Sequence, residues 1–531
     1  MSDSQKKQSF LHGTALLAMA AAIVKVIGAL YKIPLNAIIG KEGFGYFNTA
    51  YEIYSVLLMI STAGLPVAMS RMISQASSLG HYNQVRRIYA TSRSIFLALG
   101  IVGSVLMTAF CRQLAVFQNQ PDAWAAIGFL GPCVLLICIM STYRGFFQGQ
   151  SNMLPTSISQ VLEAVVKLIV GMVAALVIVK TTRSIPLAAG GAILGVTVSC
   201  LASCVYLFFR FHKSYSQMPV TEESATSFGA TAKSLLLIAI PITVGSAGLQ
   251  FLTMLETKLY MGQLLGLGYT QAEADGMRGI YGMVQTIFNM PCAMITPITI
   301  SIIPAITAQL TLKNFGEAKS TEESASRITG LISMPCAFGL ALLAEPVTAL
   351  LGGYTGQDLV LSTKLMVVLG VSIIFNAVVL FTTALMQAHG DVNRPVVNMF
   401  IGGILKLVAV YVLTKNRAIG ILGAPIGTLL CYLCITTLNI LSIRNRLEHP
   451  PAIIRNLSRS FLSAATMGVF AFGCWWGLKA VGISSRLILC ALPVMVGVVV
   501  YLVAVVKLKA ITREDVSLLP KGEKIAKLLR L

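Results

Sequence analysis

Charged residues are scarce in this chain of 531 residues: they make up 11% of it, and only 20 residues are acidic. Soluble globular proteins carry about 25% charged residues, so the chain has less than half the usual share. Hydrophobic residues make up 56%, and the mean hydropathy is +0.79. This composition excludes a soluble enzyme, a nucleic-acid-binding protein and a disordered chain. It indicates a polytopic membrane protein, in which apolar residues face lipid as well as the core.

Enzyme motifs are missing as well. The sequence contains no P-loop, no GxSxG nucleophile motif and no HExxH metal motif. Cys431 and Cys434 form a Cys-x-x-Cys pair inside an apolar run, without a second pair or a histidine, which is typical of small buried hydrophobes. We therefore expect no metal, no cofactor and no catalytic residues, and ATP-driven transport by this chain alone is disfavoured.

Long apolar runs dominate the chain. A helix needs about 20 residues to cross the hydrocarbon of a bilayer, and few segments resemble strands, so the pattern predicts an all-helical bundle of about fourteen transmembrane helices. The first run has no small-residue cleavage site after it, and we expect it to be retained rather than removed as a signal peptide. The runs start near residues 13, 47, 94, 123, 155, 188, 233, 280, 327, 361, 395, 418, 460 and 486.

Basic residues outnumber acidic ones by 40 to 20, which gives a net charge of +20. With both termini placed in the cytoplasm, 24 of the lysines and arginines lie on the cytoplasmic side, 11 lie on the other side and five lie inside spans. Cytoplasmic loops of membrane proteins carry the excess of Lys and Arg, and such charge also attracts anionic lipid headgroups. The asymmetry predicts an even number of spans with both termini cytoplasmic.

Two stretches of the chain resemble each other: 148–167 (QGQSNMLPTSISQVLEAVVK) and 387–406 (QAHGDVNRPVVNMFIGGILK). Each opens with Gln, carries Pro at the next helix start and ends with a Lys 19 residues after the Gln. Weaker matches at similar offsets pair Gly191 and Gly195 with Gly423 and Gly427, and Tyr51 with Tyr281.

These offsets, between 230 and 239 residues, each cover six helices, so the two halves keep the same orientation. The pattern predicts two parallel six-helix repeats, at 1–220 and 225–445, followed by an additional helix pair and a basic cytoplasmic tail at 446–531. Transporters with parallel repeats bind their substrate between the halves near the midplane and alternate access by rocking. The repeat therefore predicts a secondary transporter.

The stretch from Arg144-Gly-Phe-Phe-Gln-Gly149 to Glu163 resembles a signature of the stage V sporulation protein B group. That group lies in the lipid II and oligosaccharidyl-lipid flippase branch of the multidrug/oligosaccharidyl-lipid/polysaccharide (MOP) exporter superfamily. The resemblance extends to Leu11-His-Gly-Thr14 and to the tail at 513–522. It implies a V-shaped bundle of fourteen helices, as in multidrug exporters of the MATE type, with a central cavity.

The same resemblance implies an activity and a location. It implies flipping of a polyprenyl-pyrophosphate-linked saccharide across the bacterial cytoplasmic membrane for wall or surface polysaccharide assembly. A coupling cation or the membrane potential would drive transport, and cell-wall synthesis enzymes would be partners. Lys25 stands where many relatives carry Arg. The eighth span contains no Arg, and Arg278 lies just before it. We expect the substrate to be an anionic lipid-linked saccharide. A peptidoglycan precursor is the first candidate, and a polysaccharide repeat unit is the second.

Basic residues within or at the ends of spans are the candidates for substrate binding. A charged side chain at mid-membrane costs about 2.5–3.5 kcal/mol on insertion scales and is expected to face a wet cavity. Lys25 and Lys32 lie seven residues apart and share a helix face. Snorkelling or anchoring at the interface is the alternative role, above all for residues near span ends. The candidates are Lys25, Lys32, Arg71, Arg144, Lys167 and Lys406.

Two acids, Glu163 and Glu256, are candidates for coupling or gating. Glu163 precedes Lys167 by four residues, which predicts an intrahelical ion pair. Such a pair either stabilises the helix or opens when pyrophosphate or an ion arrives. In the second repeat Gly402 stands at the position of Glu163, so Lys406 lacks a local acid. Glu256 lies late in the seventh span, where it either binds a coupling cation or meets a basic residue.

Two other classes of function fit parts of the pattern. A cation-coupled antiporter of drugs or organic cations needs unpaired acids inside the membrane, whereas the deep charged residues here include more bases than acids. A membrane glycosyltransferase or polymerase needs a cluster of catalytic acids or large outer loops, and the loops here are short. The balance of charge favours a flippase for an anionic lipid-linked substrate.

Overall fold

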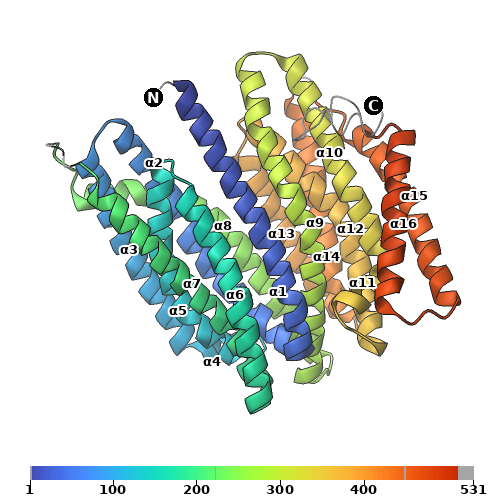
Figure 1. Cartoon of the computed structure of the whole chain (residues 1–531). Helices are drawn as coiled ribbons and strands as arrows, with labels where there is room; N and C mark the ends of the chain where they lie inside the picture. The colour runs from blue at the N-terminus through green and yellow to red at the C-terminus, as the bar shows by residue number, and fades with distance from the viewer. Residues whose placement is uncertain (1–2, 220, 222, 448–449, 512–531) are drawn as a thin grey trace. The chain divides into compact units, whose positions relative to one another are not determined.

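The computed structural model describes residues 3–219, 221, 223–447 and 450–511, and over these ranges it contains helices and no strand (Figure 1). The chain forms two compact units, Met1–Gly282 and Met283–Leu531. In the first unit lie α1 (Asp3–Met59), the π-helix η1 (Ile60–Gly64), α2 (Leu65–Ser78), α3 (Tyr82–Ala109), α4 (Cys111–Phe117), η2 (Pro121–Ala123), α5 (Trp124–Gly149), α6 (Leu154–Thr182), α7 (Ile185–Ser216), α8 (Phe228–Gly266) and the start of α9 (Gln271–Thr311).

The second unit contains the remainder of α9 and seven further α-helices within the described ranges. They are α10 (Phe315–Leu342), α11 (Ala344–Leu351), α12 (Gly356–Ala388), α13 (Asn393–Thr414), α14 (Gly423–Arg446), α15 (Ile453–Ala480) and α16 (Arg486–Lys507), with a 3-10 turn η3 (Gly420–Leu422). α15 and α16 pack against each other and α15 packs on α10, as Figure 1 shows. The predicted lobe boundaries near 220 and 445 describe the internal repeat rather than these units, and they stay a prediction.

Among the described residues, twelve helical stretches are long and apolar enough to cross a membrane, which confirms the all-helical, multi-pass architecture. The first of them, Val26–Ser78, has 53 residues, more than twice what one crossing needs. Inside it Gly40 has a φ of +70°, a conformation that glycine adopts readily. The rings of Tyr31 and Phe47 lie 6.0 Å apart, whereas 16 residues of straight helix would separate them by about 24 Å. The chain therefore folds back at Gly40, and the first two predicted spans lie on the two sides of this reversal, in α1 and α2.

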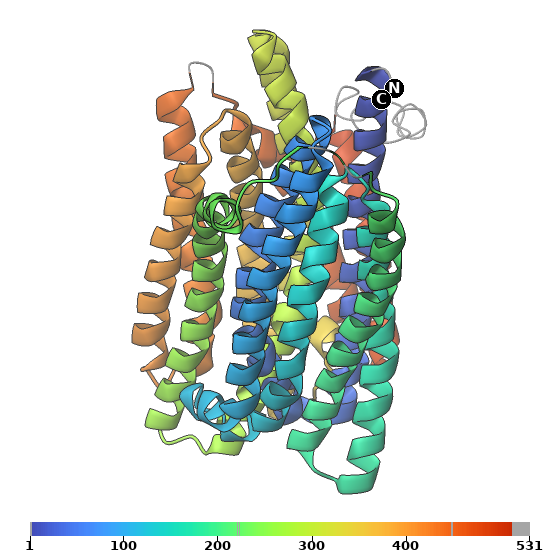
Figure 2. The same ribbon diagram turned by 90° about the vertical axis from the view of Figure 1, so that its left-hand side faces the viewer.

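The long helices α3, α5, α6 and α7 of the first unit run alongside one another, as the blue-to-green ribbons in Figure 2 show. α6 and α7 approach so closely that a Cβ on Gly195 would lie 2.4 Å from the Cα atom of Gly171 and 3.1 Å from the carbonyl oxygen of Lys167. In the second unit, a Cβ on Gly427 would lie 3.2 Å from the carbonyl oxygen of Lys406. The two halves therefore build the same lysine–glycine contact between successive helices.

Short helices also recur in the two halves. α4 follows α3, and α11 follows α10 at the corresponding place in the chain. Neither of them was expected from the sequence, because seven or eight residues are too few to show a transmembrane run. Their recurrence agrees with the parallel repeat.

Candidate functional site

An ion pair between Arg278 and Glu52 is buried in the first unit. Arg278 lies in the third turn of α9 and is only 1% exposed, and Glu52 lies on α1 beyond the reversal at Gly40. The guanidinium also lies 6.0 Å from the ring centroid of Tyr260, and the charge of Glu256 acts on it. Arg278 lies inside the helix of the eighth span, and not before it as expected from the sequence, because α9 begins at Gln271 with polar residues that precede the apolar run.

Lys32, on the first arm of α1, lies near this pair, and a second lysine, Lys167 of α6, lies near Lys32. Lys32 of α1 lies within the electrostatic reach of Lys167 of α6 and of both Arg278 and Glu52. Lys32 and Lys167 are half-buried, and within the described ranges neither has a hydrogen bond or ion pair. Two like charges held close together in a poorly hydrated place repel each other and attract an anion. The two lysines therefore form a local positive centre.

A second ion pair joins α5 to α6, one helical turn before Lys167. Arg144 of α5 donates from Nη2 to the Glu163 carboxylate at 3.1 Å and from Nε to the Ser159 hydroxyl at 3.0 Å. The predicted partner of Glu163 was Lys167, on the same helix, and that prediction is wrong. The arginine fork reaches from the neighbouring helix and bonds two groups of α6 at once, which a lysine cannot do.

These residues form what we call the charged track. It is partly buried, draws on α1, α5, α6 and α9, and lies wholly within the first unit. Its acids each have an arginine close by, and its lysines do not have an acid of their own. The track comprises Arg144, Glu163, Lys167, Lys32, Glu52 and Arg278.

The other predicted site residues fall outside the track. Arg71 is exposed on α2, and Lys406 is half-buried on α13 of the second unit. Glu256 is buried on α8, 2% exposed, within the electrostatic reach of Arg278, and its role in coupling or gating stays a prediction. The side chain of Lys25 lies outside the described residues, although α1 runs through this position.

Glu52 is a functional candidate that the sequence analysis did not identify. The burial of Arg278 was not predicted either. The signal was present, because Glu52 stands inside the second apolar run, four residues after Asn48. An acid inside a membrane span is costly and marks a partner or a functional site. The partner of Glu52 is more than 200 residues away in the chain, so no local pattern identifies it.

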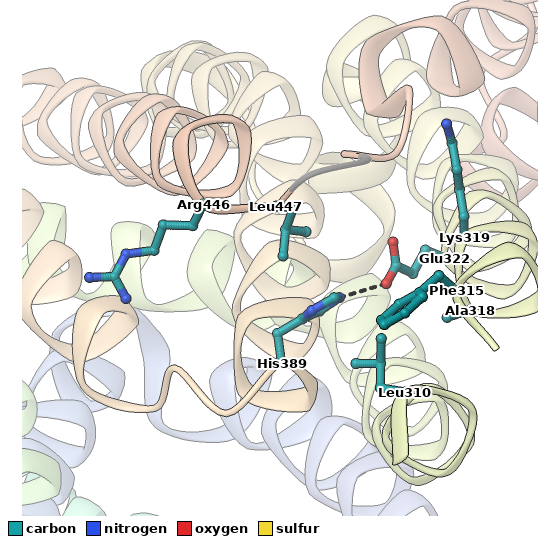
Figure 3. A pocket seen from close by; sticks show the side chains of 8 residues that line it. All are labelled: Leu310, Phe315, Ala318, Lys319, Glu322, His389, Arg446 and Leu447. Carbon is teal, nitrogen blue, oxygen red and sulfur yellow. Dashed lines mark hydrogen bonds and ion pairs between the residues drawn. The ribbon is translucent and has the colours of Figure 1, made fainter. Parts of the chain in front are cut away.

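Ionisable residues also gather at a pocket of about 350 Å³ in the second unit (Figure 3). There His389, which follows α12, lies 2.7 Å from the carboxylate of Glu322 of α10. Asp391 in the same loop pairs with Arg446 of α14 at 3.0 Å and with Arg394 at 3.6 Å. These pairs connect the loop after α12 to α10, α13 and α14. In Figure 3 the long side chains of Lys319 and Arg446 point away from the His389–Glu322 contact. The described part of the chain contains no group of three or more His, Cys, Asp or Glu residues placed to hold a metal ion.

Solved structures of two kinds share this fold. A lipid II flippase MurJ in an inward closed conformation matches with a TM-score of 0.68 and 13% identity, over 92% of this chain and 98% of its own. A multidrug resistance MATE family transporter in an inward-facing conformation matches with a TM-score of 0.65 and 14% identity, over 81% of this chain and 94% of its own. The chain therefore has the fold that these two proteins share.

The family follows from the sequence itself. The chain belongs to the polysaccharide biosynthesis protein family, whose model matches residues 10–309. Among proteins of Bacillus subtilis (strain 168), the stage V sporulation protein B is 26% identical over 82% of this chain and 84% of its own length. The lipid II flippase MurJ is 24% identical over 86% and 87%, and the uncharacterized membrane protein YabM is 25% identical over 99% and 97%. The resemblance to the sporulation protein B group is confirmed.

Proposed function

We propose that this protein is a flippase that carries an anionic lipid-linked saccharide across the bacterial cytoplasmic membrane. The observation behind the proposal is the positive centre at Lys32 and Lys167. A polyprenyl pyrophosphate brings at least two negative charges, and each charge-assisted hydrogen bond contributes roughly 1.5–3 kcal/mol. The pyrophosphate would bind these lysines, with Lys25 expected beside them on α1, while the polyprenyl tail stays in lipid.

The names of the relatives support this class of substrate. One relative is a lipid II flippase, another acts in sporulation, and the family is described as acting in polysaccharide biosynthesis. We propose a peptidoglycan precursor as the first candidate for the transported substrate and a polysaccharide repeat unit as the second. Transport would proceed by alternating access, with both termini in the cytoplasm, driven by a cation or by the membrane potential, and without chemical change to the substrate. Cell-wall synthesis enzymes would take up the product.

A cation-coupled drug antiporter remains the competing function, because a multidrug transporter has the same fold. The charged track distinguishes the two classes of substrate. Glu163 pairs with Arg144 and Glu52 pairs with Arg278, whereas neither Lys32 nor Lys167 forms an ion pair within the described residues. An organic cation would meet repulsion at Lys32 and Lys167, which an anionic headgroup would not.

The decisive experiment measures flipping of a fluorescent prenyl-pyrophosphate-linked saccharide in proteoliposomes. We expect flipping by the wild type, and a loss in Lys32→Ala and Lys167→Ala at unchanged insertion. Lys25→Ala should also lose flipping while Lys25→Arg keeps much of it, because the charge is retained. Cation-driven movement of an organic cation, with no flipping of the lipid, would replace this proposal by the antiporter.

A further inference from the structure

We infer that Arg144 is a positioning residue that keeps Lys167 available to the substrate by holding Glu163 away from it. The inference rests on the proposed function, because it explains how one lysine of the positive centre stays clear of the carboxylate on its own helix. It assigns Arg144 no contact with the substrate. Its action passes through Glu163 to Lys167.

The spacing on α6 gives Glu163 a choice of two partners. Glu163 and Lys167 lie one helical turn apart on the same face, with the acid nearer the N-terminus, which is the favourable order for an intrahelical pair. In the structure the carboxylate instead bonds Arg144 of α5 at 3.1 Å. The side chains of Arg144 and Glu163 are 16% and 24% exposed, so water competes only partly for the pair.

Arg144 is held in position by a second bond. Its Nε donates to the Ser159 hydroxyl at 3.0 Å, and that hydroxyl donates to the carbonyl oxygen of Thr156 at 2.7 Å. The arginine thus bonds both Ser159 and Glu163, one turn apart on α6. Without Arg144, Glu163 would lose its partner, and Lys167 would be the nearest base on its own helix. A pair with Glu163 would cancel the charge that Lys167 offers to pyrophosphate.

The second repeat shows what happens at the same place without an acid. At an offset of 239 residues, Gly402 corresponds to Glu163, and Thr383 corresponds to Arg144. Acid and arginine are therefore absent together, while the lysine is retained as Lys406. This is the pattern expected if the arginine serves to occupy the acid.

Packing between the helices does not by itself require the arginine. In the second unit Asn398 of α13 donates to Asn439 of α14 at 2.8 Å, and Asn439 donates to Thr382 of α12 at 3.0 Å. Neutral amide and hydroxyl groups thus join the three helices that correspond to α5, α6 and α7. Packing of these three helices against one another therefore does not require the Arg144–Glu163 ion pair.

Binding of farnesyl pyrophosphate to the purified full-length protein tests the inference. Arg144→Gln should weaken binding by at least about tenfold, the value of one charge-assisted hydrogen bond. Arg144→Gln combined with Glu163→Gln should return to within about twofold of the wild type, because no acid is left to capture Lys167. Arg210→Gln, an exposed arginine on α7, is the matched control and should bind normally. A purely structural arginine predicts the opposite, namely that the double variant is as impaired as Arg144→Gln or worse.

A second measurement needs no ligand, and so separates this inference from the proposed function. A hydrophobic carbodiimide joins a carboxylate to an amine in contact, and peptide mass spectrometry detects the product. We expect a Glu163–Lys167 cross-link in Arg144→Gln and none in the wild type. Cross-linking to the same extent in both proteins would overturn the inference. If the wild type fails to bind the pyrophosphate while the cross-link behaves as expected, the proposed function fails and the pairing of Glu163 stands.

Discussion

At the scale of single residues, the buried pair of Glu52 and Arg278 is the feature most sensitive to substitution. Removing one partner of a buried ion pair leaves an uncompensated charge and costs about 3–5 kcal/mol. Because Arg278 is 1% exposed, it cannot turn to water when Glu52 is lost. We expect Glu52→Gln to lower the melting temperature of the detergent-solubilised protein markedly.

The control for this prediction removes both charges. Glu52→Gln combined with Arg278→Gln should be more stable than Glu52→Gln alone, since the orphaned charge is gone. Arg87→Gln, which changes an exposed arginine on α3, should leave the melting temperature unchanged. Equal stability of Glu52→Gln and the wild type would show that Glu256 or solvent can replace the lost partner.

The sequence was informative about which residues are unusual but not about which ones meet. Lys32 and Lys167 stood out because bases are rare in apolar runs, and the structure brings them together in the track. The partner of Glu163 was misassigned, because spacing along one helix says nothing about an arginine on the next. The same reason hid the contact between Glu52 and Arg278, whose two positions are joined only by folding.

At the scale of elements, the contact between α6 and α7 is limited by glycine. A Cβ on Gly195 would lie 2.4 Å from backbone atoms of Gly171, and backbone cannot move aside as a flexible side chain can. Overpacking of this kind costs about 1–3 kcal/mol. We expect Gly195→Ala to lower the melting temperature and, because Lys167 adjoins the contact, to weaken binding of farnesyl pyrophosphate.

Gly473 of α15 provides the matched control. It lies within a helix, and a Cβ added there would have no neighbouring atom within 4 Å, so Gly473→Ala should be neutral or slightly stabilising through helix propensity. If both substitutions leave stability unchanged, α6 and α7 can separate at no cost, and the tight approach does not position Lys167.

The loop between α7 and α8 is tied to the start of α3 by Glu223. Its carboxylate accepts the backbone N–H groups of Asn83 at 2.8 Å and Gln84 at 3.4 Å, which have no partner inside the helix. A hydrogen bond from Thr221 and these two N–H groups lower the pKa of Glu223. A lowered pKa means that the tie is fully present above the ordinary pKa of glutamate, about 4.3, and is lost as the pH falls through the lower folded-state value.

Amide exchange of residues 82–86 measures this tie. We expect protection at pH 7 that falls toward pH 3 in the wild type, after correction for intrinsic exchange rates. In Glu223→Gln, protection should be low at pH 7 already and should change little with pH. Equal protection of both proteins at pH 7 would show that other contacts hold the loop.

Helices were the part of the fold that the sequence predicted well. All fourteen apolar runs coincide with helices, because the bilayer requires about 20 apolar residues in a row. The predicted starts were late by up to about a dozen residues at α3 and α10, since polar first turns extend beyond the hydrocarbon. The short helices α4 and α11 and the reversal at Gly40 have no such requirement and left no comparable pattern.

At the scale of the whole molecule, the distribution of basic residues predicts the orientation in the membrane. A single cysteine at Ser216, the last residue of α7, should resist an impermeant thiol reagent added to intact cells, because this end of α7 is expected in the cytoplasm. A single cysteine at Tyr269, between α8 and α9, should react. Labelling with the opposite pattern would invert the topology. The same orientation places the tail at 512–531, outside the described residues, in the cytoplasm.

The reversal at Gly40 also has a consequence for how the protein is made. Lys32 and Glu52 lie on the two arms that meet there, and each lies within the electrostatic reach of the other. A lone lysine that leaves the translocation channel for lipid costs about 2.5–3.5 kcal/mol, and an acid is costly too. Two arms that leave the channel as a hairpin carry opposite charges into lipid together, which offsets part of each cost. The arm of α1 before Gly40 would therefore stay beside the translocation channel until the arm after Gly40 has been synthesised. The two arms would then enter the lipid together, as a pair of helices.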